Sequence, residues 1–157
     1  MTRILLLPIF LFSVPSWAQG KTTIVFVCEH GGARSTIASV YFNKMAQENQ
    51  LSYQSIFRGL TPDSVITKET KKGLTEDEFE TKSLSPTPLS EKDIDANTVF
   101  ISLDCIPPPS YPMYDSWKGI PMISEDYVKA RSAILKCVNK LITELKTKNV
   151  NSKNLKK

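Results

Sequence analysis

Cys28 and Arg34, six residues apart, are the residues of this sequence best suited to covalent chemistry. The β-branched run 22–27 predicts a buried strand ending at the cysteine, and helical periodicity begins just after the arginine. Peptide N–H groups between a strand and a helix can converge on one anion, which the helix dipole also favours. The arginine fork matches two oxygens of a phosphate-like group. The pattern therefore predicts that the Cys28 thiolate attacks a tetrahedral oxyanion, with Arg34 binding it.

The residues between and beside this pair complete the predicted site. Gly31 and Gly32 permit positive φ and a close approach of the backbone to the ligand. Ser35 is expected to be catalytic, since its hydroxyl can donate to the Cys28 thiolate and later to the sulfur as it leaves. His30 either contacts the anion or only lines the rim of the site. The expected substrate-binding residues are Glu29, His30, Gly31, Gly32, Ala33 and Arg34.

The rest of the chain alternates strand-like and helix-like segments, which is typical of an α/β fold with a parallel sheet. The expected strands share β-branched or alternating apolar residues and lie at 22–27, 53–59, 80–84 and 98–103. Helices are expected at 35–50 and 66–74, with one helical turn from the capping box at Ser90 and a last helix capped by Ser124. Residues 107–119 form a proline-rich segment and are expected to be a loop.

The other two cysteines have different predicted roles. Cys105 follows the strand 98–103, at the sheet edge where open α/β folds bind ligands. It is either a redox partner of Cys28 or an inert buried thiol. Cys137 lies on the apolar stripe of the last helix, which favours a packing role. One histidine and the lack of a C-x-x-C motif argue against a Cys/His metal site.

The first 18 residues have the pattern of a signal peptide. Arg3 gives a positive start, an apolar run follows at 4–14, and Ser16-Trp17-Ala18 is typical of a cleavage site. This run is shorter than the ~20 residues that span a bilayer, so we expect no stable membrane anchor. A retained anchor or a buried helix is the alternative. We expect the mature chain to begin at Gln19 and to be exported to the periplasm or secreted.

Composition sets further limits on the 157-residue chain. With 41% apolar residues it is expected to form one domain, at 19–148. The segment 149–157 contains lysines and no acidic residue, and we expect a flexible basic tail there. The formal net charge of +4 is modest, so no nucleic-acid partner is expected.

The segment Cys28-Glu29-His30-Gly31-Gly32-Ala33-Arg34-Ser35 resembles the loop C-x-G-N-x-x-R-S of the low-molecular-weight protein tyrosine phosphatase family, which includes thioredoxin-coupled arsenate reductases. The resemblance continues at 57–63, 99–103 and 124–131, so it extends over most of the chain. It implies a three-layer α/β sandwich, with a four-stranded parallel sheet and helices on both faces. It also implies that no metal or organic cofactor is needed.

Three positions depart from the family pattern. The Asn that fixes the family loop is Gly31 here, so the loop is expected to be held less rigidly. Ala33 replaces the second cysteine common in the phosphatase branch, as it does in the reductase branch. The Asp-Pro general acid has no clear counterpart around 117–121, and Asp115 is the nearest candidate. Its alternative is an ordinary solvated loop aspartate.

The resemblance and the residues together predict a phosphomonoesterase of the phosphotyrosine type. It would act on a phosphorylated substrate through a cysteinyl-phosphate on Cys28. One alternative is an arsenate reductase using Cys28 and Cys105 with a thioredoxin-like reductant, although the third cysteine of that branch is absent. The other is a catalytically weak oxyanion-binding protein that lacks the general acid.

Overall fold

A computed structural model describes residues 21–154, which form an α/β fold around one four-stranded sheet. All strand pairs are parallel, and the spatial order is β2-β1-β3-β4. The strands are β1 (Thr22–Cys28), β2 (Tyr53–Gly59), β3 (Thr98–Leu103) and β4 (Met113–Trp117). The predicted fold class and parallel sheet are confirmed. The predicted signal peptide lies outside the described residues.

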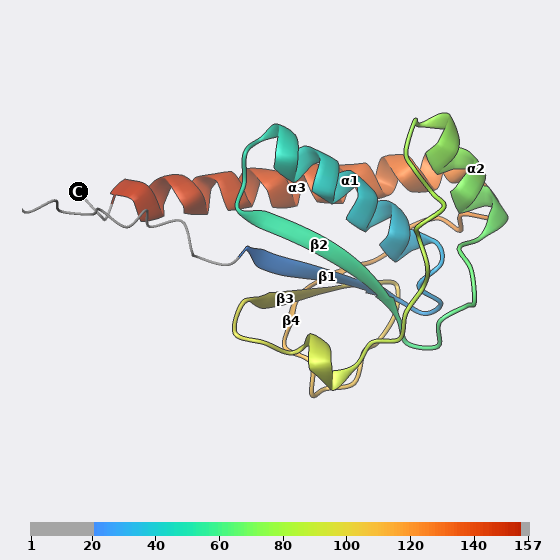
Figure 1. Cartoon of the computed structure of the whole chain (residues 1–157), viewed down its shortest axis with the longest axis horizontal. Helices are drawn as coiled ribbons and strands as arrows, with labels where there is room; N and C mark the ends of the chain where they lie inside the picture. The colour runs from blue at the N-terminus through green and yellow to red at the C-terminus, as the bar shows by residue number, and fades with distance from the viewer. Residues whose placement is uncertain (1–20, 155–157) are drawn as a thin grey trace, which may run out of the picture.

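All three α-helices lie on one face of this sheet, above it in Figure 1. They are α1 (Arg34–Glu48), α2 (Lys68–Glu76) and α3 (Tyr127–Asn154). The predicted apolar stripe of the last helix is confirmed, because Ala130, Ile134 and Val138 are completely buried against α1 and the sheet. Phe26 and Ile101 supply the sheet side of this core.

The opposite face of the sheet has a different cover. It consists of the 3-10 turn η1 (Glu91–Asp93) and the proline-rich segment that follows β3, which enclose a smaller apolar cluster that includes Phe100 and Tyr111. The 3-10 turn begins with the predicted capping box at Ser90. The expectation of α-helices on both faces was therefore wrong for the described residues, because this turn and loops cover the second face. Successive prolines fix φ and remove donors, so the segment cannot form a helix there.

The fourth strand is not where the sequence predicted it. Residues 80–84 form a turn, in which Leu84 N donates to Thr81 O at 3.2 Å, and they join no ladder. The strand at the other edge is instead β4, inside the segment expected to be a loop. Its central residues are exposed, so it lacks the apolar alternation that marks a half-buried strand.

The last helix also begins differently. Asp126, rather than Ser124, caps α3, because its Oδ1 accepts from Lys129 N at 2.9 Å. The helix continues to Asn154, into the segment predicted to be a basic tail, while residues 155–157 lie outside the description. No helix among residues 21–154 is both long and apolar enough to cross a bilayer.

Candidate active site

Cys28 lies at the carboxyl end of β1, in the middle of the sheet and beneath the start of α1. Its side chain is buried, with 4% of the residue exposed. Sγ lies 3.1 Å from Oγ of the fully buried Ser35, in the first turn of α1. Ser35 is thus placed to donate to a thiolate, and the structure brings together these two predicted residues.

The loop between β1 and α1 uses most of its carbonyl oxygens in hydrogen bonds to the segment after β2. The carbonyls of Glu29, His30 and Gly32 accept backbone N–H bonds of 2.9–3.0 Å from the segment 61–67. Within the described part of the chain, the N–H groups of residues 30–33 have no protein acceptor. These N–H groups are thus available to a ligand, and they belong to the loop that leads into the positive end of α1. Such a concave set of donors binds anions.

A close contact between two glycines holds this loop against β2. Gly31 has φ +67°, and a Cβ there would lie 3.0 Å from the backbone N of Gly59. Thr36 Oγ1 donates to Gly31 O at 2.6 Å. The hydroxyl of Thr36 therefore fixes the loop at the position where the resembling family has an asparagine. Sequence reasoning missed Thr36, whose signal is a hydroxyl residue in the first turn of the helix.

Arg34 begins α1 and lies beside the same loop. Its Nη2 donates to Ile120 O at 3.2 Å, and its Nε lies 3.8 Å from Asp104 Oδ2. That separation allows an ion pair but not a hydrogen bond, so the buried Nε has no acceptor among the described residues. The guanidinium is oriented by protein contacts and retains donors for an oxyanion.

Asp104 is a site residue that the sequence analysis did not assign. It adopts φ +47° just after β3, and its carboxylate accepts from Gly119 N at 2.8 Å and Ile120 N at 2.9 Å. One side chain therefore ties the segment after β4 to Arg34. The signal available in the sequence was an aspartate at the carboxyl end of a parallel strand.

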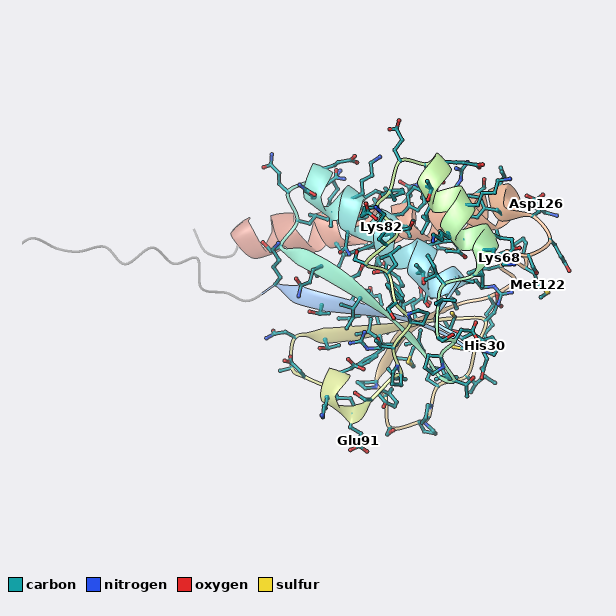
Figure 2. The ribbon with its side chains drawn as sticks, turned by 45° about the vertical axis from the view of Figure 1, so that its right-hand side comes forward. His30, Lys68, Lys82, Glu91, Met122 and Asp126 are labelled. Carbon is teal, nitrogen blue, oxygen red and sulfur yellow. The ribbon has the colours of Figure 1, made fainter. Side chains whose placement is uncertain are left out.

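These residues open onto a cavity of about 180 Å³. Cys28, Glu29, His30, Ala33 and Arg34 line one side. The other side comes from two distant segments, at the start of α2 and before α3. Figure 2 shows His30, Met122 and Lys68 at the same end of the molecule. The residues of the far wall are Thr67, Glu69, Met122, Ile123 and Ser124.

Solved structures with this arrangement of elements are known. An arsenate reductase from Archaeoglobus fulgidus is 23% identical, with a TM-score of 0.62 over 76% of this chain and 98% of that one. A thioredoxin-dependent arsenate reductase from Corynebacterium glutamicum is 24% identical, with a TM-score of 0.65 over 83% of this chain and 65% of that one. A low-molecular-weight protein tyrosine phosphatase from T. tengcongensis is 15% identical, with a TM-score of 0.65 over 79% of this chain and 99% of that one.

The chain has the low-molecular-weight phosphatase fold. The resemblance noted in the sequence is confirmed at the level of fold, over most of the chain. No model of a protein family matches the sequence, and no curated protein shows significant similarity to it.

The predicted general acid lies apart from this phosphatase-fold pocket. Asp115 is on β4 and does not line the cavity. Its Oδ1 accepts from Ser116 N at 2.8 Å and its Oδ2 from Trp117 Nε1 at 3.0 Å. In the register of the sheet it is the partner of Ile101. Burial raises the pKa of Cys137 on α3, and the charge of Asp115 adds to this effect. The structure therefore does not bring Asp115 together with Cys28.

The second cysteine lies close to the first but on the other face of the sheet. Cys105 is in the apolar cluster opposite the helices, and its thiol donates to Val27 O at 3.4 Å. Burial raises the pKa of Cys105 to about 11, and the nearby Cys28, Glu29 and Asp104 add to this effect. All three cysteines of the described residues are free thiols. These residues hold no group of three or more His, Cys, Asp or Glu side chains arranged for a metal ion.

A polar cluster fixes the three helices that surround the pocket. Asp77, just after α2, accepts hydrogen bonds from Tyr41 of α1 and Tyr127 of α3, each at 2.7 Å, and pairs with Arg131. Burial opposes the charged carboxylate, but these hydrogen bonds outweigh burial and lower the pKa of Asp77. The Tyr127 ring packs directly on Gly73 of α2. The cluster therefore sets the position of α2 and α3, which carry or adjoin the far wall.

Proposed function

We propose that this protein is a cysteine-dependent phosphomonoesterase that acts on aryl phosphates of the phosphotyrosine type. The observation that carries the proposal is the buried Cys28 Sγ, 3.1 Å from Ser35 Oγ at the base of a cavity that Arg34 also lines. Ala33, Met122 and Ile123 give this cavity apolar walls, which suit an aromatic leaving group. The fold, shared with a low-molecular-weight tyrosine phosphatase, supports the same conclusion.

The first chemical step is in-line attack on phosphorus. The Cys28 sulfur forms an S–P bond while the bond from phosphorus to the leaving oxygen breaks. Arg34 and the free N–H groups of residues 30–33 stabilise the charge on the non-bridging oxygens. Water then attacks the cysteinyl-phosphate, the S–P bond breaks, and inorganic phosphate leaves. The hydroxyl of Ser35 stabilises the sulfur as a thiolate before and after the cycle.

Release of phosphate from p-nitrophenyl phosphate tests this proposal. Cys28→Ser should abolish turnover, because an alcohol at this position is not ionised, and it should keep binding inorganic phosphate. Cys137→Ser is the matched control, since Cys137 lies on α3 outside the cavity. Full activity in Cys28→Ser, or equal losses in the two variants, would contradict the assignment. Phosphate binding without wild-type turnover would instead indicate a non-catalytic oxyanion-binding protein.

Arsenate reduction is a second candidate, favoured by the contact between Cys105 and the backbone of β1. The Cys105 thiol is 3.4 Å from Val27 O, one residue before Cys28, and two structural neighbours are described as arsenate reductases. Cys28 would bond to arsenic in place of one arsenate oxygen, which leaves as water, and Cys105 would then attack the Cys28 sulfur. That step releases arsenite, leaves a Cys28–Cys105 disulfide, and requires a thioredoxin-like dithiol for the next cycle.

The phosphatase is the better-supported candidate because Cys105 is buried on the far face and its raised pKa disfavours the attacking thiolate. The two candidates differ in one measurable product. Incubation with arsenate should convert a reductase to a form lighter by two hydrogens, and Cys105→Ser should prevent that change. A phosphatase should hydrolyse aryl phosphate equally well with and without Cys105→Ser.

A further inference from the structure

We propose that His30 is the proton donor and acceptor of this reaction, oriented by Thr61 and Asp63. The inference rests on the proposed phosphatase function and assigns the acid that the fold's usual loop lacks here. His30 follows Cys28 by two residues and lines the same cavity. It is the one histidine in the chain, and histidine is the side chain whose ordinary charge change falls between pH 5 and 8.

The ring of His30 is held through one nitrogen. Nδ1 lies 3.2 Å from the carbonyl oxygen of Thr61 and 3.8 Å from Asp63 Oδ1. A carbonyl oxygen can only accept, so Nδ1 carries the hydrogen of this bond in both charge states. Nε2 is therefore the ring nitrogen at which a proton can be gained or lost. The carbonyl of Thr61 therefore fixes the tautomer of the neutral ring, and Asp63 Oδ1 lies near the same nitrogen.

Among the described residues, His30 supplies the imidazole on this cavity and Glu69 supplies the carboxyl group on its far wall, so Glu69→Gln is the comparison variant for the acid. The segment after β4, which ends at Pro121, contains no carboxylate, and Asp104 accepts from its N–H groups and faces Arg34. Glu29 Oε1 accepts from Thr61 Oγ1 at 3.0 Å, and Asp115 lies outside the cavity. An acid is needed most for alkyl esters, whose leaving oxygen is a strong base.

In each catalytic cycle Nε2 of His30 donates one proton and accepts one proton. As the bond from phosphorus to the leaving oxygen breaks and the bond to the Cys28 sulfur forms, the His30 imidazolium gives its Nε2 proton to that oxygen. The alcohol departs and leaves neutral His30, still protonated at Nδ1. The same Nε2 then takes a proton from the water that attacks the cysteinyl-phosphate. Phosphate and a thiolate form, and the imidazolium is restored for the next cycle.

The charges facing His30 come from several segments. Glu29 and Arg34 belong to the same loop and its helix, with Cys28 at the base of the cavity. Asp63 lies on the segment after β2, and Glu69 on the first turn of α2. The residues 122–124 that line the cavity before α3 carry no charge. Three carboxylates and one guanidinium therefore lie around the imidazole or the cavity that it lines.

A series of phosphate monoesters with leaving groups from nitrophenol to alkyl alcohols tests this assignment. His30→Asn is the informative variant, because its side-chain amide can still donate to Thr61 O but cannot transfer a proton. It should lower kcat/KM for alkyl esters by about 10²–10⁴-fold, and for nitrophenyl phosphate by less than about tenfold. The dependence of rate on leaving-group pKa should steepen in His30→Asn. Asp63→Asn should show a smaller steepening, because Thr61 O still orients the ring.

The controls separate this inference from the proposed function. Phosphate binding by His30→Asn checks that the loop remains intact. Nitrophenyl phosphate turnover that is lost in Cys28→Ser, with an unchanged leaving-group slope in His30→Asn, would overturn the role of His30 alone. Steepening in Asp115→Asn instead of His30→Asn would assign the acid to Asp115. A wild-type protein without turnover of any ester would overturn both proposals.

Discussion

Replacing Gly73 with alanine should destabilise the protein, although the same change inside an ordinary helix is stabilising. Gly73 lies within α2 and is buried against the ring of Tyr127. An added Cβ would fall closer to three ring atoms than the 3.0 Å that Cβ atoms essentially never cross. The ring would have to move away from α2, and its hydroxyl donates to Asp77 at 2.7 Å. Movement of the ring would therefore break this hydrogen bond in the polar cluster that joins α1, α2 and α3.

The magnitude follows from three contributions. Overpacking a filled site costs about 1–3 kcal/mol. Loss of the Tyr127 hydrogen bond to the charged Asp77 costs about 1.5–3 kcal/mol, because a bond to a charged group is stronger than a neutral one. The higher helix propensity of alanine stabilises the helix by about 1 kcal/mol. We expect Gly73→Ala to lower the free energy of unfolding by about 1.5–5 kcal/mol, given these magnitudes.

Urea unfolding followed by circular dichroism measures this change. Lys72→Ala is the matched control, because Lys72 immediately precedes Gly73 in α2 and its side chain is 78% exposed. We expect that control to shift the free energy of unfolding by less than about 0.5 kcal/mol. In a Tyr127→Ala background the ring is absent, so Gly73→Ala should become neutral or stabilising. A Gly73→Ala protein as stable as wild type, with Tyr127 present, would refute this reasoning.

Three further predictions concern the site, acid stability and export. Arg34→Lys should lower kcat/KM by roughly two to four orders of magnitude in steady-state assays, because a point charge cannot bind two oxygens as the guanidinium fork does; near-native rates would contradict the anion-binding role. Because the pKa of Asp77 is lowered in the folded protein, its stabilising effect is complete above its unfolded pKa and is lost as the pH falls below about 4. Urea titrations across pH should show this loss in wild type and not in Asp77→Asn, and parallel curves would disprove it. Mass spectrometry of the native exported protein should find Gln19 at its N-terminus, whereas intact chain in the cytosol would argue against export.

The loop between β1 and α1 was predictable because its parts are contiguous in the sequence. Cys28 and Ser35 are separated by one short turn between a buried strand and a helix, and both elements have strong local signals. Their mutual geometry is thus set mainly by local backbone structure. The same holds for β3 and for the capping box at Ser90, which were also predicted correctly.

The edge strand β4 was not predictable in this way. Met113–Trp117 is short, mostly exposed and preceded by prolines, so its own pattern indicates a loop. It becomes a strand because β3 offers a free edge, and Ser116 Oγ accepts from Ser102 Oγ at 2.8 Å across that edge. Pairing of this kind depends on a partner distant in sequence, which a local pattern does not encode.

The sequence by itself determined that Cys28 and Arg34 lie on one turn between a strand and a helix, since strand, loop and helix propensities act over a few residues. Only the tertiary structure decided what faces that turn. It placed Asp104 against Arg34, Thr61 against His30, and Asp115 outside the cavity. Those contacts join segments tens of residues apart, and their geometry follows from how the helices and loops pack on the sheet. Packing of that kind is a property of the whole chain and has no local signature.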